Sequence, residues 1–143
     1  MGEAKHVSIL ALATAIEQLE QFESLVVPRN ADLSGEDGAA LFAMLASKPG
    51  LRKLKFYHAR LGHHLTNILS LARLTELDLR GCQIKDAGAV ALAAVLSQNG
   101  VHSSAQGGIR LEVLGLTNNE IRPDGVVAIA KALEDNSTVH SIK

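Results

Sequence analysis

A short alternation of apolar and polar residues occurs twice in the chain and is followed each time by a glycine and a longer apolar segment. The framework positions of the two copies are Leu74, Leu77, Leu79, Cys82 and Ile84, and then Leu111, Leu114, Leu116, Asn119 and Ile121. The alternation predicts a short strand. The segments 89–96 and 126–133, which follow Gly88 and Gly125, have the composition of packed helices. The pattern therefore predicts a strand-and-helix unit that is repeated.

Two earlier copies share this framework. One has Leu51, Leu54, Phe56, Ala59 and Leu61, and the other, which is looser, has Phe22, Leu25, Val27, Asn30 and Leu33. The looser copy carries one extra residue between Asn30 and Leu33, and a helix is expected after it over residues 39–45. The stretch after Leu61 is too short for a full helix, and Leu65 stands where the other copies have glycine.

The spacing between units fixes the boundaries. The last helical apolar residue precedes the next framework by six positions from Leu45 to Leu51 and from Leu133 to Val139, and Ile16 to Phe22 has the same spacing. The first helix is therefore the second half of a unit that lacks its strand. We expect one domain over 1–143, with a capping helix at 1–21, repeats at about 22–50, 51–73, 74–110 and 111–138, and the start of a further strand at 139–143.

This framework resembles leucine-rich repeat proteins of the ribonuclease-inhibitor type, a class that includes NOD-like receptors, tropomodulins and the Ran GTPase-activating protein. The resemblance implies an α/β solenoid, a short horseshoe with a parallel β-sheet on the concave face and α-helices on the convex face. The physics agrees, because a single strand and helix cannot bury its apolar side alone, whereas stacked neighbours can. Asn30, Cys82 and Asn119 are then predicted to form a structural ladder, in which short polar side chains satisfy backbone groups of the turns.

Side chains alternate along a strand, so the inward framework positions determine which residues face a ligand. The predicted protein-binding residues of the concave face are Lys53, Lys55, Tyr57, His58, Glu76, Asp78, Arg80, Val113 and Thr117. In these rows Lys53 lies beside Glu76, and Lys55 lies beside Asp78. Tyr57 and Arg80 are residue types that dominate protein interfaces. An alternative interpretation is that the charges neutralise one another in the free protein and contribute little.

Composition narrows the range of partners. The net charge is -1 and only 3% of residues are aromatic, which argues against a nucleic-acid or anionic-membrane partner and favours protein partners. No apolar run approaches the roughly 18 residues of a membrane span. The apolar run at 7–16 could be misread as a secretory leader, but its helical spacing continues to Phe22 and favours an amphipathic helix. A single cysteine favours a reducing, cytoplasmic compartment, including cytoskeletal or ciliary assemblies.

Candidate chemistry is sparse. His63 and His64, with His58 nearby, suggest a metal group, but adjacent histidines point in different directions and no Cys or carboxylate has ligand spacing to them. Cys82 stands where two other copies have Asn30 and Asn119, which favours a buried structural thiol over a nucleophile. The catalytic Arg and acidic tail that the Ran GTPase-activating resemblance would require have no counterpart. We expect no catalytic residues, no metal, no cofactor and no enzymatic activity.

The two ends of the predicted solenoid and one inserted segment do not fit the regular repeat. Glu17, Gln18, Glu20 and Gln21 would give the first helix a polar outer face, as a cap needs. The edge at Val139–Ile142 would be exposed, so either further repeats follow or a partner covers it. The irregular segment Gln98–Arg110 is either a contact loop or a tolerated insertion.

These observations predict a non-catalytic protein-interaction scaffold, or a structural subunit of a larger assembly, that binds through the concave face. Two alternatives remain open: a regulatory module that inhibits or activates an enzyme or GTPase, and a recognition fragment of an immune-type receptor.

Overall fold

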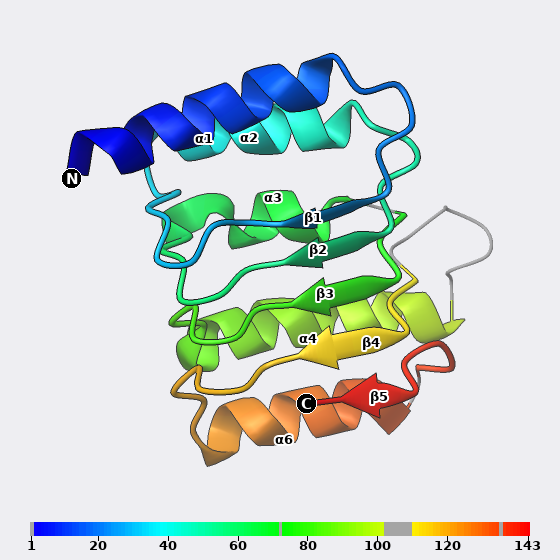
Figure 1. The fold of residues 1–143 in the computed structure, drawn as a ribbon. Helices are drawn as coiled ribbons and strands as arrows, with labels where there is room; N and C mark the ends of the chain where they lie inside the picture. Colours follow the sequence, from blue (N-terminus) through cyan, green and yellow to red (C-terminus); the bar gives the residue numbers. More distant parts are fainter. Residues whose placement is uncertain (1, 72, 102–109, 135) are drawn as a thin grey trace.

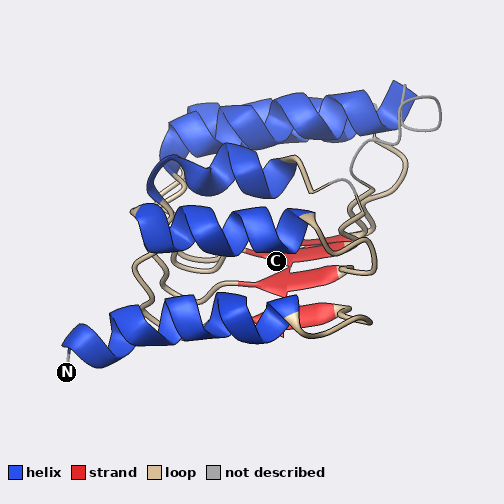
Figure 2. Ribbon diagram, turned by 90° about the horizontal axis from the view of Figure 1, so that it is seen from above, coloured by secondary structure: helices blue, strands red, loops and turns tan. Residues whose placement is uncertain are grey.

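The computed structural model describes residues 2–71, 73–101, 110–134 and 136–143, and it has one sheet layer and one helix layer (Figures 1 and 2). Five parallel strands lie side by side in sequence order. They are β1 (Ser24–Val26), β2 (Lys53–Lys55), β3 (Glu76–Asp78), β4 (Val113–Gly115) and β5 (Ser141–Ile142). A parallel sheet with one strand per repeat confirms the predicted α/β solenoid.

Helices connect successive strands on one side of the sheet (Figure 2). They are α1 (Gly2–Glu17), α2 (Glu36–Ala46), the 3-10 turn η1 (Gly62–His64), α3 (Leu65–Leu69), α4 (Lys85–Val101) and α6 (Pro123–Glu134). The second repeat has only the 5-residue α3, in agreement with the short stretch predicted after Leu61. The opposite side of the sheet carries no described helix, and we call it the concave face.

The strand register places equivalent framework residues in rows. Leu25, Leu54, Leu77 and Leu114 pair in sequence order, and Ile142 extends the row. The four leucines are at most 8% exposed, whereas Ile142 on the last strand is 44% exposed. The same register sets Lys53 opposite Glu76 and Lys55 opposite Asp78, which confirms the predicted rows.

The hydrophobic core lies between the sheet and the helices. The first three strands each supply a second inward residue immediately after the strand ends, and these buried residues are Val27, Phe56 and Leu79. Each helix adds its own apolar row, and the fully buried members include Leu41, Leu45, Leu92 and Leu96. Because every repeat packs only on its neighbours, the core is a continuous stack of layers.

Glycines at the start of the helices allow this packing. A Cβ added to Gly38 would lie 1.8 Å from the carbonyl oxygen of Leu33, and one added to Gly125 would lie 2.6 Å from Cγ2 of Ile121. Any side chain at these positions would push the helix away from its turn. Leu65 is at the equivalent position of the second repeat.

The first repeat corrects one element of the predicted ladder. Asn30 is exposed and has a left-handed backbone conformation with φ 64°. The turn residue His58 of the next repeat has a similar conformation, with φ 55°. Ala31 is 4% exposed and occupies the ladder position, as Ala59 does at 1% in the next repeat. The extra residue of the first repeat therefore lies before Asn30 and not after it. Asparagine is suited to this turn because its short polar side chain tolerates the left-handed conformation.

The first helix packs on α2 at the N-terminal end of the stack (Figure 1). Ile9, Ala13 and Ile16 are its buried side chains. The helix ends at Glu17, so the predicted polar outer face is wrong in part, because Gln18, Glu20 and Gln21 lie beyond it. Lys48 secures this end: its Nζ donates hydrogen bonds to the carbonyls of Glu17 (3.2 Å) and Leu19 (2.7 Å).

The fourth helix is longer than the sequence pattern predicts. It runs from Lys85 to Val101, whereas the apolar pattern indicated residues 89–96 and an irregular segment from Gln98. The expectation of irregular structure over Gln98–Arg110 is therefore wrong for its first four residues, where helix propagation continues through Gly100. Residues 102–109 of that segment lie outside the described residues.

Candidate functional site on the concave face

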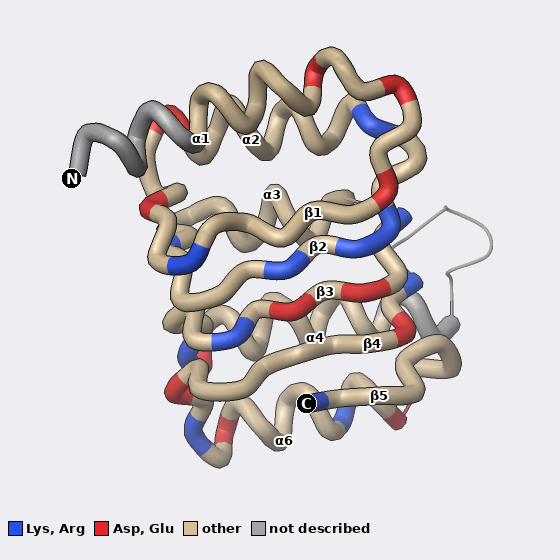
Figure 3. Tube along the Cα trace, viewed as in Figure 1, with Lys and Arg blue, Asp and Glu red and all other residues tan. Residues whose placement is uncertain are grey.

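The predicted binding residues lie in three parallel rows across the concave face. The first row contains Ser24, Lys53, Glu76, Val113 and Ser141, and the second contains Val26, Lys55, Asp78 and Gly115. Tyr57, Arg80 and Thr117 follow at the ends of their strands. Figure 3 shows basic positions along β2 directly beside acidic positions along β3. The face is therefore a mixed-charge surface whose charges alternate between strands.

The centre of this face contains an ion pair. Nζ of Lys55 lies 3.0 Å from Oε2 of Glu76, and both side chains are less than one-third exposed. The pair runs diagonally, because Lys55 is directly opposite Asp78 in the register. The hydrogen bond to Glu76 raises the pKa of Lys55, and the same bond lowers the pKa of Glu76. Part of the central charge is thus compensated within the protein.

Asp78 is held in place by its own strand. Its Oδ1 accepts a hydrogen bond from the backbone N–H of Arg80 at 3.1 Å. The carboxylate also covers Gly115, where an added Cβ would lie 2.5 Å from Oδ1. Gly115 is buried, and its Cα is the surface on which Asp78 rests.

A second group gathers where the strands end. The guanidinium carbon of Arg80 lies 5.7 Å from the centre of the Tyr57 ring, a distance at which a cation and an aromatic face attract. Arg29, Tyr57, His58 and Arg80 line a hollow of about 190 Å³, which we call the rim hollow. The sequence prediction included three of these four residues and missed Arg29, because it placed the extra residue of the first repeat after Asn30 and not before it.

The ladder position shows what the predicted polar side chains do. Asn119 is 2% exposed. Its Oδ1 accepts hydrogen bonds from the N–H groups of Cys82 (2.8 Å) and Ile84 (3.2 Å), and its Nδ2 donates to the carbonyls of Leu79 (2.7 Å) and Thr117 (3.3 Å). One side chain thus joins the turns of two repeats.

Cys82 occupies the preceding ladder position. Its thiol is buried and contacts the carbonyl oxygens of Phe56 (3.8 Å) and Arg80 (3.4 Å). Burial raises the pKa of the Cys82 thiol from 9.0 to about 11. The thiolate is the nucleophilic form, so this environment suits a structural residue.

Three connecting residues gave no periodic signal in the sequence. Oδ1 of Asn136 accepts hydrogen bonds from the N–H groups of Thr138 (2.9 Å) and Val139 (2.8 Å), while its Nδ2 donates to the carbonyl of Leu96 (3.0 Å). Asp86 accepts from the N–H of Arg122 at 2.7 Å, and Lys48 caps α1 as described above. The contacts of Asn136 with Leu96, of Asp86 with Arg122 and of Lys48 with α1 span 29–40 residues in sequence, so local spacing could not reveal them.

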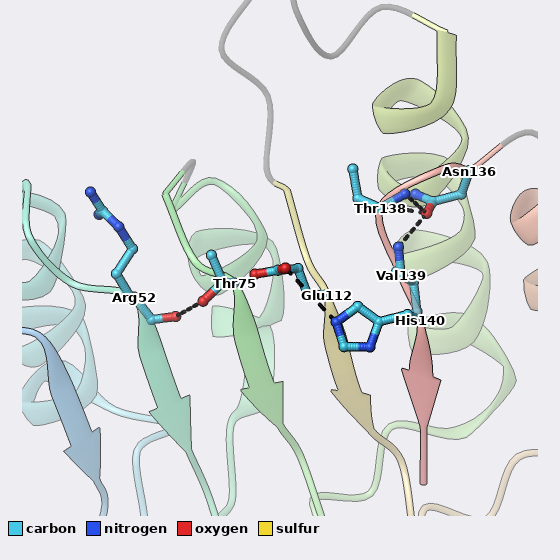
Figure 4. A network of polar contacts seen from close by, with 7 residues as sticks. All are labelled: Arg52, Thr75, Glu112, Asn136, Thr138, Val139 and His140. Atoms are coloured by element: carbon cyan, nitrogen blue, oxygen red, sulfur yellow. Dashed lines mark hydrogen bonds and ion pairs between the residues drawn. The ribbon is translucent and has the colours of Figure 1, made fainter.

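The starts of the strands form another polar row, shown in Figure 4. Oγ1 of Thr75 donates to the carbonyl of Arg52 at 3.3 Å, and Nε2 of His140 lies 3.8 Å from Oε1 of Glu112. Both partners of the second contact are more than half exposed. These contacts join neighbouring strands and so help to align them. Because the ion pair is exposed, it contributes little to stability or to the affinity for a partner.

His64, one of the histidines considered as metal ligands, has other contacts. His64 packs its ring 5.1 Å from the ring of Phe42 and lies within hydrogen-bond distance of Asn67 and the Gly35 carbonyl. The described residues contain no group of three side chains suited to hold a metal ion. No helix among them is long and apolar enough to cross a bilayer.

The C-terminal end of the stack exposes apolar surface. A groove of about 480 Å³ is lined mainly by apolar residues of the fourth repeat and by Ile142 of β5. Val126 and Val127 of α6 are 55% and 50% exposed. Among the described residues, no strand pairs with the outer edge of β5.

Comparison with known proteins agrees with this architecture. Residues 73–93 and 111–130 match the leucine-rich repeat family model. No curated protein matches the chain significantly. Parallel strands that alternate with helices, together with the two matched segments, are consistent with a short solenoid of leucine-rich repeats. Such repeats generally form protein-interaction modules and are usually non-catalytic.

Proposed function

We propose that this protein is a non-catalytic interaction module, either a scaffold or a structural subunit of a larger assembly, and that it binds a protein partner through the concave face. The observation that carries the proposal is the cation–π pair of Arg80 and Tyr57 on that face. Both are residue types that concentrate binding energy at interfaces, and their contact reduces the side-chain freedom that binding must remove.

The rest of the face supports a division between its centre and its rim. Lys55 and Glu76 compensate each other, so the centre contributes more to shape and selectivity than to affinity. At the rim, the described residues place no carboxylate within ion-pair distance of Arg80. The affinity is therefore assigned to Tyr57, His58 and Arg80, with Lys53, Val113 and Thr117 as surrounding contacts.

The test begins with capture of partners from the native cell and their identification by mass spectrometry. The dissociation constant of a recovered partner is then measured for wild type, for Tyr57→Ala/Arg80→Ala and for the control Lys131→Ala/Glu134→Ala on exposed positions of α6. We expect the concave double variant to bind at least about 100-fold more weakly, as two hot-spot truncations do. The control variant should bind as wild type does. Unchanged binding by the concave double variant would disprove the proposal.

Stoichiometry separates a structural subunit from the regulatory alternative. A subunit should co-purify in a fixed ratio, whereas a regulator of an enzyme or GTPase should bind reversibly and change the rate of that enzyme. The receptor-fragment alternative predicts a nucleotide-binding region in the same polypeptide.

The apolar groove and the unpaired edge of β5 support membership of a larger assembly. Exposed apolar surface next to a strand edge favours association. We expect the isolated chain to self-associate in light scattering, and we expect a variant extended by one capping repeat to be monomeric. A stable monomer of the unextended chain at high concentration would contradict this part of the proposal.

A further inference from the structure

The rim hollow brings together residues that are far apart in the sequence. Arg29 follows β1, Tyr57 and His58 follow β2, and Arg80 follows β3. Backbone hydrogen bonds hold these three turns side by side: the N–H of Asn30 donates to the carbonyl of Tyr57 (3.1 Å), and the N–H of His58 donates to that of Arg80 (2.9 Å). The hollow is thus part of the repeat framework and does not depend on a long loop.

The polar groups of the hollow are unbalanced in charge. Its lining of Arg29, Tyr57, His58 and Arg80 contains two guanidinium groups and an imidazole but no carboxylate. Among the described residues, neither arginine has an acidic side chain within ion-pair distance. The nearest acidic residue in sequence, Asp78, already accepts a hydrogen bond from the backbone of Arg80. An anion entering the hollow would therefore meet unpaired donors.

Two contacts position these donors in advance. The Tyr57 ring lies beneath the Arg80 guanidinium at 5.7 Å. The His58 ring rests against Gly81, where an added Cβ would lie 2.3 Å from Nδ1. Donors that are already oriented lose less conformational entropy on binding than free surface side chains.

We infer that the rim hollow binds a carboxylate side chain, Glu or Asp, in an acidic segment of the partner protein. This inference rests on the proposed function and names the chemistry of the partner. Guanidinium groups match a carboxylate in planar, bidentate geometry, and they supply the shorter, charge-assisted kind of hydrogen bond. The hollow has a volume of about 190 Å³, which is the scale of one side chain.

The surrounding charges favour a peptide over a nucleic acid. Lys53 lies on β2, the strand that Tyr57 and His58 follow, and extends the positive charge along it, whereas Lys55 is paired with Glu76. Glu76 and Asp78 lie on the next strand, where they would repel a continuous phosphate backbone. A peptide with separated acidic residues can engage the basic positions and avoid the acidic ones.

The experiment uses fluorescence anisotropy with the full chain and a fluorescein-labelled peptide of alternating Glu and Gly at low ionic strength. A Gln and Gly peptide of equal length is the matched probe. We expect the Glu peptide to bind at least about 10-fold more tightly than the Gln peptide, with an affinity that falls as salt is added. Equal affinity of the two peptides would overturn the inference.

Variants locate the binding. Arg29→Gln and Arg80→Gln should each weaken binding of the Glu peptide by about 10-fold, as expected when one charge-assisted contact is lost. Lys131→Gln on α6 removes a positive charge elsewhere and should change the affinity by less than about 2-fold. Circular dichroism and thermal unfolding would verify that each variant folds. If the double variant Arg29→Gln/Arg80→Gln retains the affinity of wild type, the hollow is not the site.

A third peptide distinguishes the source of the anion. It replaces one Gln of the Gln and Gly peptide with phosphoserine. Binding at least about 10-fold tighter than that of the Glu peptide would overturn the carboxylate assignment in favour of a phosphorylated segment. If the Glu peptide fails while a captured partner still depends on Tyr57 and Arg80, this inference fails and the proposed function stands. If neither binds, both fail.

Discussion

The two halves of the stack satisfy the same backbone groups in different ways. In the C-terminal half, Oδ1 of the ladder residue Asn119 accepts hydrogen bonds from the N–H groups of Cys82 and Ile84. In the N-terminal half the ladder residues are Ala31 and Ala59, which have no polar side chain. There the backbones bond directly: the N–H of Arg60 donates to the carbonyl of Ala31 (2.9 Å), and the N–H of Leu33 donates to that of Arg60 (2.8 Å).

This difference shows that the turn imposes a requirement on hydrogen bonding and not on residue type. Buried N–H groups must find acceptors, which either a side-chain amide or an extra backbone bridge can supply. The second repeat also differs in its helix, with 5 residues in α3 against 11, 17 and 12 in α2, α4 and α6. The matched family segments, 73–93 and 111–130, lie in the C-terminal half, where both features are regular.

The largest expected effect comes from removing the ladder amide. Asn119→Ala leaves two buried N–H groups and two carbonyls without that partner, and we expect it to lower the free energy of unfolding by about 3 kcal/mol. Asn30→Ala is the control, since this exposed residue loses only the preference of asparagine for its left-handed turn, about 1 kcal/mol. Urea denaturation measures both. Equal losses would show that the halves do not differ in their dependence on ladder side chains.

The second prediction concerns the access of a thiol reagent to Cys82, the buried ladder residue of the third repeat. A thiol whose pKa rises from 9.0 to about 11 has about 100-fold less thiolate at pH 8. We expect Cys82 in the native protein to react with a disulfide reagent such as DTNB at least that much more slowly than in urea. The control is an exposed cysteine at Ala43 in a Cys82→Ala background, which should react at the rate of a free thiol. Rapid native reaction of Cys82 would contradict the buried ladder.

The third prediction compares the short helix of the second repeat with the long helix of the third repeat. The 5-residue α3 is little more than one turn and has few internal hydrogen bonds, whereas α4 is long and packs on α6. Amide hydrogen exchange followed by mass spectrometry should therefore be about 10-fold or more faster in residues 65–69 than in residues 89–96. Equal protection would mean that the whole stack opens as one cooperative unit.

The smallest expected effect concerns the ion pair between the second and third repeats. Glu76→Gln should lower the free energy of unfolding by under about 1 kcal/mol near neutral pH. The exposed Glu134→Gln serves as a control that leaves this pair intact.

The pH dependence of this effect has a definite sign. The pKa of Glu76 is lowered from 4.5, so its contribution is present above that value and disappears as pH falls through the lowered pKa. The pKa of Lys55 is raised from 10.5, so its contribution is present below that value and disappears as pH rises through the raised pKa. A difference between wild type and Glu76→Gln that grows in acid would contradict this assignment.

Periodicity was sufficient to predict the fold and the rows of the concave face. Framework leucines determine which side chains point inward, and the register that sets Lys53 opposite Glu76 follows from that alone. Periodicity could not predict where the extra residue of the first repeat lies, because Leu33 stays in the core whether that residue is placed before or after Asn30. Arg29 was missed for this reason. The diagonal bond of Lys55 to Glu76 was also missed, because a long side chain can reach a neighbouring row.

The non-periodic contacts are a further class that sequence could not supply. Lys48, Asp86 and Asn136 each join segments about one repeat apart, and none belongs to the framework pattern. Their partners are mostly backbone groups, which every residue carries, so residue identity gives no signal. The length of α4 was underestimated because Gly100 is a poor helix former that its context overrides.

The short α3 has a mechanical consequence. The helices of a solenoid act as the thick outer layer of a bent beam, and bending stiffness is lowest where that layer is thinnest. Hollows of about 410 and 200 Å³ lie next to α2 and α3 on this side of the molecule. We therefore expect the stack to bend most easily at its second repeat, in which Tyr57 follows β2. A partner that binds in the rim hollow would therefore exert its force on the second repeat, where we expect bending to be easiest.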